Sequence, residues 1–135
     1  MNKETIKDEE YIFEGSTIIS QTDLSGKITF ANRRFCEVSG YNIDELINQP
    51  HNIIRHPDMP QVIFEKMWDT LSSGMTWTGL VKNMRKDGLY YWVDTEILPI
   101  KSENNELTGY IASRKAASRS NIEDAEAMHD KMTQE

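Results

Sequence analysis

The start of the chain combines β-branched residues with turn residues. Residues 16–22 and 27–30 predict two strands, and the Asp-Leu-Ser-Gly sequence between them is typical of a hairpin turn. In the second strand Ile28 and Phe30 are two positions apart, so we expect both side chains on one face. The chain is therefore predicted to open with a β-hairpin.

Helical patterns follow this hairpin. Asn32 is placed to cap a helix that buries Phe35 and Val38. A second, short helix is predicted by the capping box at residues 42–45. A longer helix is predicted over residues 60–73, where the apolar residues recur at helical spacing: Val62, Ile63, Met67, Trp68 and Leu71.

The last third of the domain predicts three long antiparallel strands. They cover residues 77–83, 90–100 and 107–115 and are joined by two short turns, the first with an Asp-Gly pair. One face of the first of these strands carries Trp77, Gly79, Val81 and Asn83. Two strands, three helices and three further strands predict an α+β fold, with a five-stranded antiparallel sheet and helices on one face.

Both ends of the chain differ from this middle part. Residues 1–15 predict an N-terminal cap, residues 16–117 the domain itself, and residues 118–135 a C-terminal helix. The apolar residues of that helix form a narrow stripe on a charged surface: Ile122, Ala125, Met128 and Met132. A stripe this thin is typical of a helix that faces a partner, and we expect His129 beside it to be solvated.

Composition narrows the class of protein. The 22 acidic and 15 basic residues give a net charge of −7, which makes nucleic acid an unexpected partner. A single cysteine, Cys36, excludes an internal disulfide and a multi-cysteine metal site. No apolar run approaches the roughly 18 residues that cross a bilayer, so we expect a cytoplasmic module that reaches a membrane only through a longer parent protein.

The segment over residues 50–60, PHNIIRHPDMP, is the strongest candidate for a site. Its prolines exclude a helix interior and bias their neighbours toward extended geometry, so the segment is short and stiff. It holds Arg55, His56 and Asp58, and rigid polar loops often carry binding residues. The alternative is a structural salt-bridge and capping cluster that locks the loop.

Four blocks of the sequence resemble one family. They are TDLSGKITFAN (22–32), SGYNIDELINQPHNIIRHPDMP (39–60), WTGLVKNMRKDGLYYWV (77–93) and TGYIASR (108–114). With the order of elements, they resemble the PAS sensor domain of bacterial aerotaxis receptors and of PAS-containing methyl-accepting chemotaxis proteins. The resemblance implies a PAS fold and non-covalently bound FAD, whose redox state reports on oxygen or respiratory electron flow.

The resemblance also implies which residues hold FAD. It assigns this role to Arg55, His56 and Asp58, and their chemistry agrees: a guanidinium binds phosphate bidentately, an imidazole donates or stacks, and the carboxylate can orient Arg55. The other candidate contacts are two amides, a small residue that leaves room for a ring, and three aromatic residues: Asn32, Asn83, Gly79, Trp68, Trp77 and Tyr91.

Other readings of these residues remain open. Trp68 is also compatible with core packing, and Asn83 with a bond to backbone at a strand end. On the same scaffold, His51 or His56 would be the axial ligand of a haem-binding gas sensor. A cofactor-free interaction module is a third alternative.

An enzyme is the least expected class, because no nucleophile–base pair, P-loop or metal-ligand motif appears at usable spacing. The expected partners are the signalling domains of the parent receptor, such as a HAMP or methyl-accepting region. A second copy of the PAS domain is a further expected partner.

Overall fold

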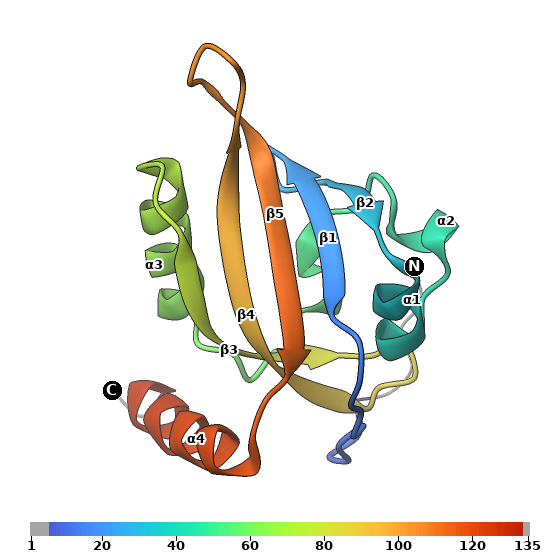
Figure 1. Ribbon diagram of the computed structural model, residues 1–135. Coiled ribbons are helices and arrows are strands. Elements are labelled where there is room, and N and C mark those ends of the chain that lie inside the picture. Colours follow the sequence, from blue (N-terminus) through green and yellow to red (C-terminus); the bar gives the residue numbers. More distant parts are fainter. Residues whose placement is uncertain (1–5, 134–135) are drawn as a thin grey trace.

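The computed structural model describes residues 6–133, which form one sheet with helices around it (Figure 1). Its strands are β1 (Ile18–Asp23), β2 (Ile28–Ala31), β3 (Trp77–Met84), β4 (Tyr90–Lys101) and β5 (Leu107–Ala116). Its helices are α1 (Arg33–Ser39), α2 (Ile43–Leu46), the 3-10 turn η1 (His51–Ile54), α3 (Gln61–Ser72) and α4 (Arg119–Thr133). Every predicted strand and helix is present, and η1 is an additional element within the 50–60 segment.

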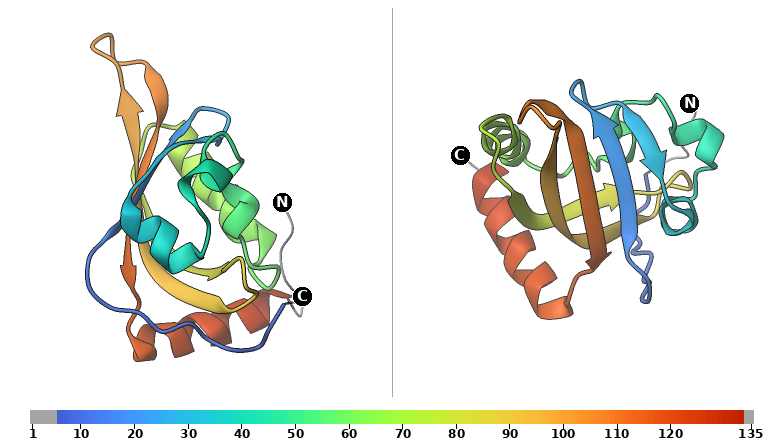
Figure 2. Two further views of the ribbon diagram at one scale, coloured as in Figure 1. Left: turned by 90° about the vertical axis from the view of Figure 1, so that its right-hand side faces the viewer. Right: turned by 45° about the horizontal axis from the view of Figure 1, so that its top comes forward.

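The five strands form one antiparallel sheet in the order β2-β1-β5-β4-β3. Helices α1, α2 and α3 lie on one side of this sheet, as the second view of the molecule shows (Figure 2). The α+β class and the five-stranded antiparallel sheet with helices on one face are therefore confirmed. The main core fills the space between the helices and the sheet, with Phe35 and Val38 of α1 at most 1% exposed.

For two apolar side chains the orientation that the sequence pattern predicted is wrong. Phe30 is 46% exposed although Ile28 is fully buried, because the β1–β2 register skips one residue at Thr29. One extra residue in a strand turns the following side chain to the opposite face. On α3, Val62 is 38% exposed and Phe64 takes the buried position.

The N-terminal segment runs along the start of β4. The Tyr11 amide donates to the Tyr90 carbonyl over 2.6 Å, and the Tyr90 amide donates to the Glu9 carbonyl over 3.1 Å. The Phe13 ring meets Tyr91 of β4 edge-on, with centroids 6.1 Å apart. Residues 1–5 of the expected N-terminal cap lie outside the described residues.

Helix α4 packs on the opposite face of the sheet from α1–α3. Ile122 and Ala125 bury Trp92, whose strand neighbours point into the main core. His129 is also buried, with its ring centroid 5.7 Å from that of Trp92, so the expected solvated position is wrong. Ile122 and Ala125 of the apolar stripe therefore cover the domain's own outer sheet face, while Met128 stays exposed.

Because Ile122 is 2% exposed against Trp92, a charge there should release α4 from the sheet. We expect Ile122→Asp to cost about 2 kcal/mol or more of local stability. Amide hydrogen exchange should then lose protection across residues 119–133 while β3–β5 keep theirs. Met128→Asp on the same helix is the matched control, and equal loss of protection in both variants would contradict this packing.

Candidate functional site

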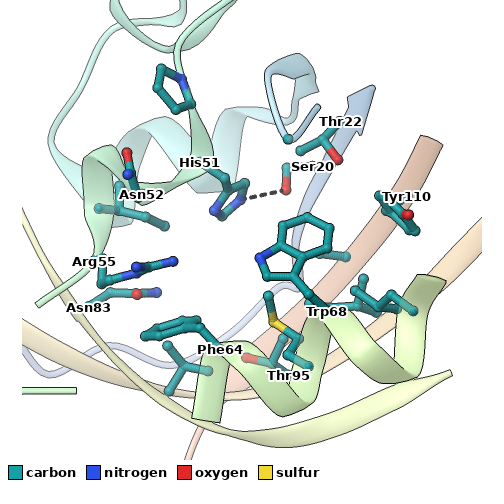
Figure 3. A pocket seen from close by; sticks show the side chains of 18 of the residues that line it. Ser20, Thr22, His51, Asn52, Arg55, Phe64, Trp68, Asn83, Thr95 and Tyr110 are labelled. Carbon is teal, nitrogen blue, oxygen red and sulfur yellow. Dashed lines mark hydrogen bonds between the residues drawn. The ribbon is translucent and has the colours of Figure 1, made fainter. Parts of the chain in front are cut away.

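A cavity of about 240 Å³ lies between the helices and the inner face of the sheet (Figure 3). Its apolar wall comes from all sides of the core: Ile54, Phe64, Met67, Trp68, Leu71, Val81, Ile97, Tyr110 and Ala112. Its polar wall includes Ser20, Thr22, His51, Asn52, Arg55, Asn83, Thr95 and Arg114. Residues from the hairpin, the 50–60 segment, α3 and the three long strands therefore meet in one space.

Three of these polar side chains form a hydrogen-bonded cluster, in which Ser20 and Arg114 are buried and His51 is half-buried. One guanidinium nitrogen of Arg114 on β5 lies 2.7 Å from Nε2 of His51 and 2.9 Å from the Ser20 hydroxyl oxygen. The Ser20 hydroxyl is also 3.2 Å from the same His51 nitrogen. Arginine only donates, so Nε2 of His51 is an acceptor and the imidazole is neutral.

The electrostatics of the cluster agree with this assignment. Burial, aided by the neighbouring charge of Arg114, lowers the pKa of His51 to about 3. Burial also lowers the pKa of Arg114 to about 10, so this side chain remains a cation at neutral pH. The cluster therefore presents one positive charge and no proton-accepting carboxylate to the cavity.

The cavity carries two cations without a matching anion. Arg55 and Arg114 both line it, and no aspartate or glutamate is among its lining residues in the described part of the chain. Among the side chains that line the cavity, three buried polar atoms have no hydrogen-bond partner within the described residues: Nε of Arg55, Nη1 of Arg114 and the Thr95 hydroxyl. Unpaired buried donors are costly, so this set is suited to a ligand with several acceptor atoms.

Arg55 points into the cavity from the end of η1 (Figure 3). Its guanidinium lies 3.7 Å from the centroid of the Phe64 ring, a cation–π contact with α3. Its backbone pairs with Asn83 in an isolated β-bridge, which fixes the segment to β3. Burial lowers the pKa of Arg55.

Asn83 lies between the cavity and Tyr91, which is behind the cavity wall. It is 4% exposed, lines the cavity from β3 and lies opposite Tyr91 in the β3–β4 register. Burial raises the pKa of Tyr91, and a side-chain hydrogen bond with Asn83 acts in the opposite direction. Tyr91 is not a lining residue, so the expected aromatic wall is instead a second layer that meets Phe13.

Two residues of the 50–60 segment do not reach the cavity. His56 is buried, but its Nδ1 accepts the Asp58 amide over 3.0 Å and its ring packs edge-on against Tyr90. Asp58 is turned outward and pairs with Lys82 over 3.2 Å, so it does not orient Arg55. In this structure His56 is thus held by a partner within the segment and Asp58 by a partner on β3.

Three further candidates also lie outside the lining set. The Asn32 side chain caps α1 by accepting the Phe35 amide over 3.0 Å, and it accepts the Ile19 amide over 3.1 Å. The Trp77 ring covers Gly79, where an added Cβ would lie 2.6 Å from the indole. The space left by the missing Gly79 side chain is therefore filled by Trp77 and not open to a ligand.

Sequence reasoning did not identify Ser20, Thr95 or Arg114 as site residues, and it considered His51 as a haem ligand on the alternative reading. One signal was available for Arg114. It shares a strand face with Tyr110 and Ala112, so its charge falls on the inward face of a central strand. A lone inward cation on a buried strand is rare enough to indicate a site.

The described residues contain no group of three or more histidine, cysteine or acidic side chains arranged to hold a metal ion. Within the same residues, no helix combines the length and apolar character that crossing a bilayer requires.

Comparison with known proteins places this geometry in a family. The chain is 44% identical over 116 residues to the aerotaxis receptor of Escherichia coli K12, which covers 86% of this chain and 23% of the receptor. It is 36% identical over 102 residues to the nitrogen fixation regulatory protein of Klebsiella pneumoniae, covering 76% of this chain and 21% of that protein. The chain thus spans about a fifth of the length of these curated relatives.

Solved structures agree with the fold. The PAS domain of a Colwellia psychrerythraea protein superposes with a TM-score of 0.70 at 26% identity, covering 76% of this chain and 87% of that one. A light-oxygen-voltage domain studied with a flavin analogue gives a TM-score of 0.72 at 20% identity, covering 85% and 86%. A sequence model of the PAS fold matches residues 28–114. The chain therefore belongs to the PAS fold family.

Proposed function

We propose that this domain is a redox or oxygen sensor that binds FAD non-covalently and signals within an aerotaxis or chemotaxis receptor. The observation that carries the proposal is the cavity, whose apolar walls lie beside the guanidinium groups of Arg55 and Arg114 with no carboxylate among its lining residues in the described part of the chain. The 44% identity to the aerotaxis receptor supports the same biological role. The proposed location is the cytoplasmic part of a longer receptor, whose own signalling domains receive the output.

The residues present fit the ring of a flavin. Phe64, Val81 and Ile97 offer apolar surface on opposite sides, as a planar heterocycle requires. Arg114 and Asn83 offer donors, and Asn83 also an acceptor, to the carbonyl and nitrogen atoms at the polar end of such a ring. At about 240 Å³ the cavity is smaller than the roughly 300–1,000 Å³ of most ligand pockets, so only the ring fits inside.

If the ring lies inside the cavity and the phosphates outside it, the role proposed for Arg55 changes. Its guanidinium lies over Phe64 inside the cavity, with Nε buried and unpaired. We therefore propose that Arg55 contacts the ring end of the cofactor and not its phosphates. His56 and Asp58 support this position by fixing the loop through their own bond and the pair with Lys82.

A bound flavin would supply reversible electron uptake coupled to a change of proton at a ring nitrogen. Asn83 can respond to such a change, because its amide is shared between the cavity and the Tyr91 hydroxyl. Tyr91 in turn contacts Phe13 of the N-terminal segment. Glu10 of that segment accepts from Arg119 of α4 through both carboxylate oxygens, over 2.8 and 3.0 Å. The N-terminal segment and α4, the two elements that would carry the signal onward, are therefore linked to each other.

Haem is less well supported. An axial histidine needs a free ring nitrogen, but Nε2 of His51 already accepts from Arg114 over 2.7 Å. His56 does not line the cavity. A cofactor-free role does not explain why the donors Nε of Arg55 and Nη1 of Arg114 are buried without a partner.

An absorption spectrum of the freshly purified protein, before and after dithionite, tests the proposal. We expect the two bands of oxidised flavin, their loss on reduction and their return in air. Acid release and chromatography should then identify the pigment as FAD. A colourless protein that takes up no added FAD, or an intense Soret band, would refute the assignment.

Asn83→Ala should weaken flavin binding, because it removes a buried amide that pairs with the ring. A lost hydrogen bond of about 1–3 kcal/mol corresponds to a roughly 5- to 150-fold rise in Kd, measured by fluorescence titration of the apoprotein. Asn104→Ala, in the exposed β4–β5 turn, is the matched control. Equal affinities in both variants would remove Asn83 from the site.

A further inference from the structure

The exposed lining residues of the cavity mark where it opens to solvent. Most of its lining residues are buried or half-buried, and the exposed ones are Ser25, Pro50, Asn52 and Trp68. These four belong to the β1–β2 turn, the 50–60 segment and α3. The mouth of the cavity is therefore the gap between these three pieces of the chain.

The indole of Trp68 reaches from α3 across this gap (Figure 3). A Cβ built on Gly26 of the β1–β2 turn would lie 3.7 Å from the indole, which is van der Waals contact. On the sheet side, Tyr110 of β5 meets the same indole edge-on, with centroids 5.5 Å apart. The Trp68 indole of α3 thus lies between the β1–β2 turn and the sheet, and the residue is 36% exposed.

Trp68 lies at the boundary between the part of a ligand that the cavity would hold and the part that would extend into solvent. On the proposed function a planar ring would occupy the cavity of about 240 Å³, and the remainder of a dinucleotide would leave through the mouth. An acyclic tail can lie beside the indole, between Trp68 and the Pro50–Asn52 segment. A fused ring is wider than such a tail, and the indole between the β1–β2 turn and Tyr110 stands in its way.

We propose that Trp68 is a door that retains the ligand and selects for a planar heterocycle carrying a thin, acyclic, polar tail. This inference rests on the proposed flavin function and adds to it the residue that sets the rate of ligand release. Opening needs only a rotation of the Trp68 side chain, since one side of the indole already faces solvent. Release of the ring then waits on this rotation, whatever the tail carries beyond the mouth.

The test is the dissociation rate of riboflavin, FMN and FAD from the loaded protein, followed by the recovery of flavin fluorescence. For Trp68→Ala we expect release roughly tenfold or more faster, by a similar factor for all three ligands, since changes at a binding site act mainly on dissociation. Trp68→Phe keeps part of the cover and should be intermediate. Phe30→Ala, which truncates another half-exposed aromatic residue outside the cavity, should stay within about twofold of wild type.

The outcomes distinguish failure of the proposal that Trp68 is a door from failure of the flavin proposal. A wild type that binds flavin together with unchanged release in Trp68→Ala would overturn the door and leave the flavin assignment intact. A wild type that takes up none of the three flavins would overturn both. Circular dichroism checks that each variant is folded, and if Trp68→Ala is not, an unchanged release rate in Trp68→Phe is the result that overturns the door.

Discussion

Arg114→Met should stabilise the empty protein and weaken its binding of flavin. The Arg114 guanidinium is 4% exposed, faces no carboxylate in the cavity and keeps one nitrogen without a partner. Replacing a buried charge by an apolar side chain of similar volume often stabilises a protein by about 1–4 kcal/mol. Loss of a charged hydrogen bond to the ligand should raise the Kd for FAD roughly 10- to 100-fold.

Urea denaturation of the apoprotein and fluorescence titration with FAD measure the two effects separately. Lys115→Met, one residue further along β5 and exposed, is the matched control and should change neither quantity by much. A loss of stability together with unchanged FAD affinity would show that Arg114 is a structural residue. Opposite signs in the two measurements are the signature of a group kept for its ligand.

Acid should destabilise the protein through His51. Its pKa is about 3 in the folded protein, because the half-buried imidazole loses most of its solvation and lies beside Arg114, and about 6.5 when unfolded. Between these values the unfolded chain binds a proton that the folded chain does not, so stability falls as the pH falls. Its contribution is complete above pH 6.5, and about 3 kcal/mol of it is lost by pH 4.

His51→Asn should flatten this part of the stability profile, measured by urea denaturation at several pH values between 7 and 4. Carboxylates titrate in the same range, so the comparison is the difference between the slopes of wild type and variant. Arg114→Met should also reduce the slope, because the second cause of the low His51 pKa is then absent. Identical slopes in wild type and His51→Asn would contradict the buried neutral state of this histidine.

The elements of the fold could be predicted because each has a local signal. The Asn32 cap, the capping box at residues 42–45 and the alternation of the long strands depend on neighbours within a few residues. The inward face of β2 could not be predicted. One skipped residue at Thr29 moves Phe30 outward, and this bulge depends on pairing with β1.

The site was predictable only in part, for a similar reason. The stiff loop identifies Arg55. In the same loop His56 accepts the Asp58 amide and Asp58 pairs with Lys82 of β3, and the sequence alone does not reveal these partners. The cluster of Ser20, His51 and Arg114 forms only when β1, η1 and β5 come together. No spacing along the chain encodes that meeting.

A crystal structure of the protein reconstituted with FAD tests the central claim most directly. We predict a flavin ring inside the cavity, with its polar edge within hydrogen-bond distance of Asn83 and Arg114 and its tail leaving beside Trp68. A cavity that stays filled with solvent or side chains while FAD binds elsewhere would contradict the account.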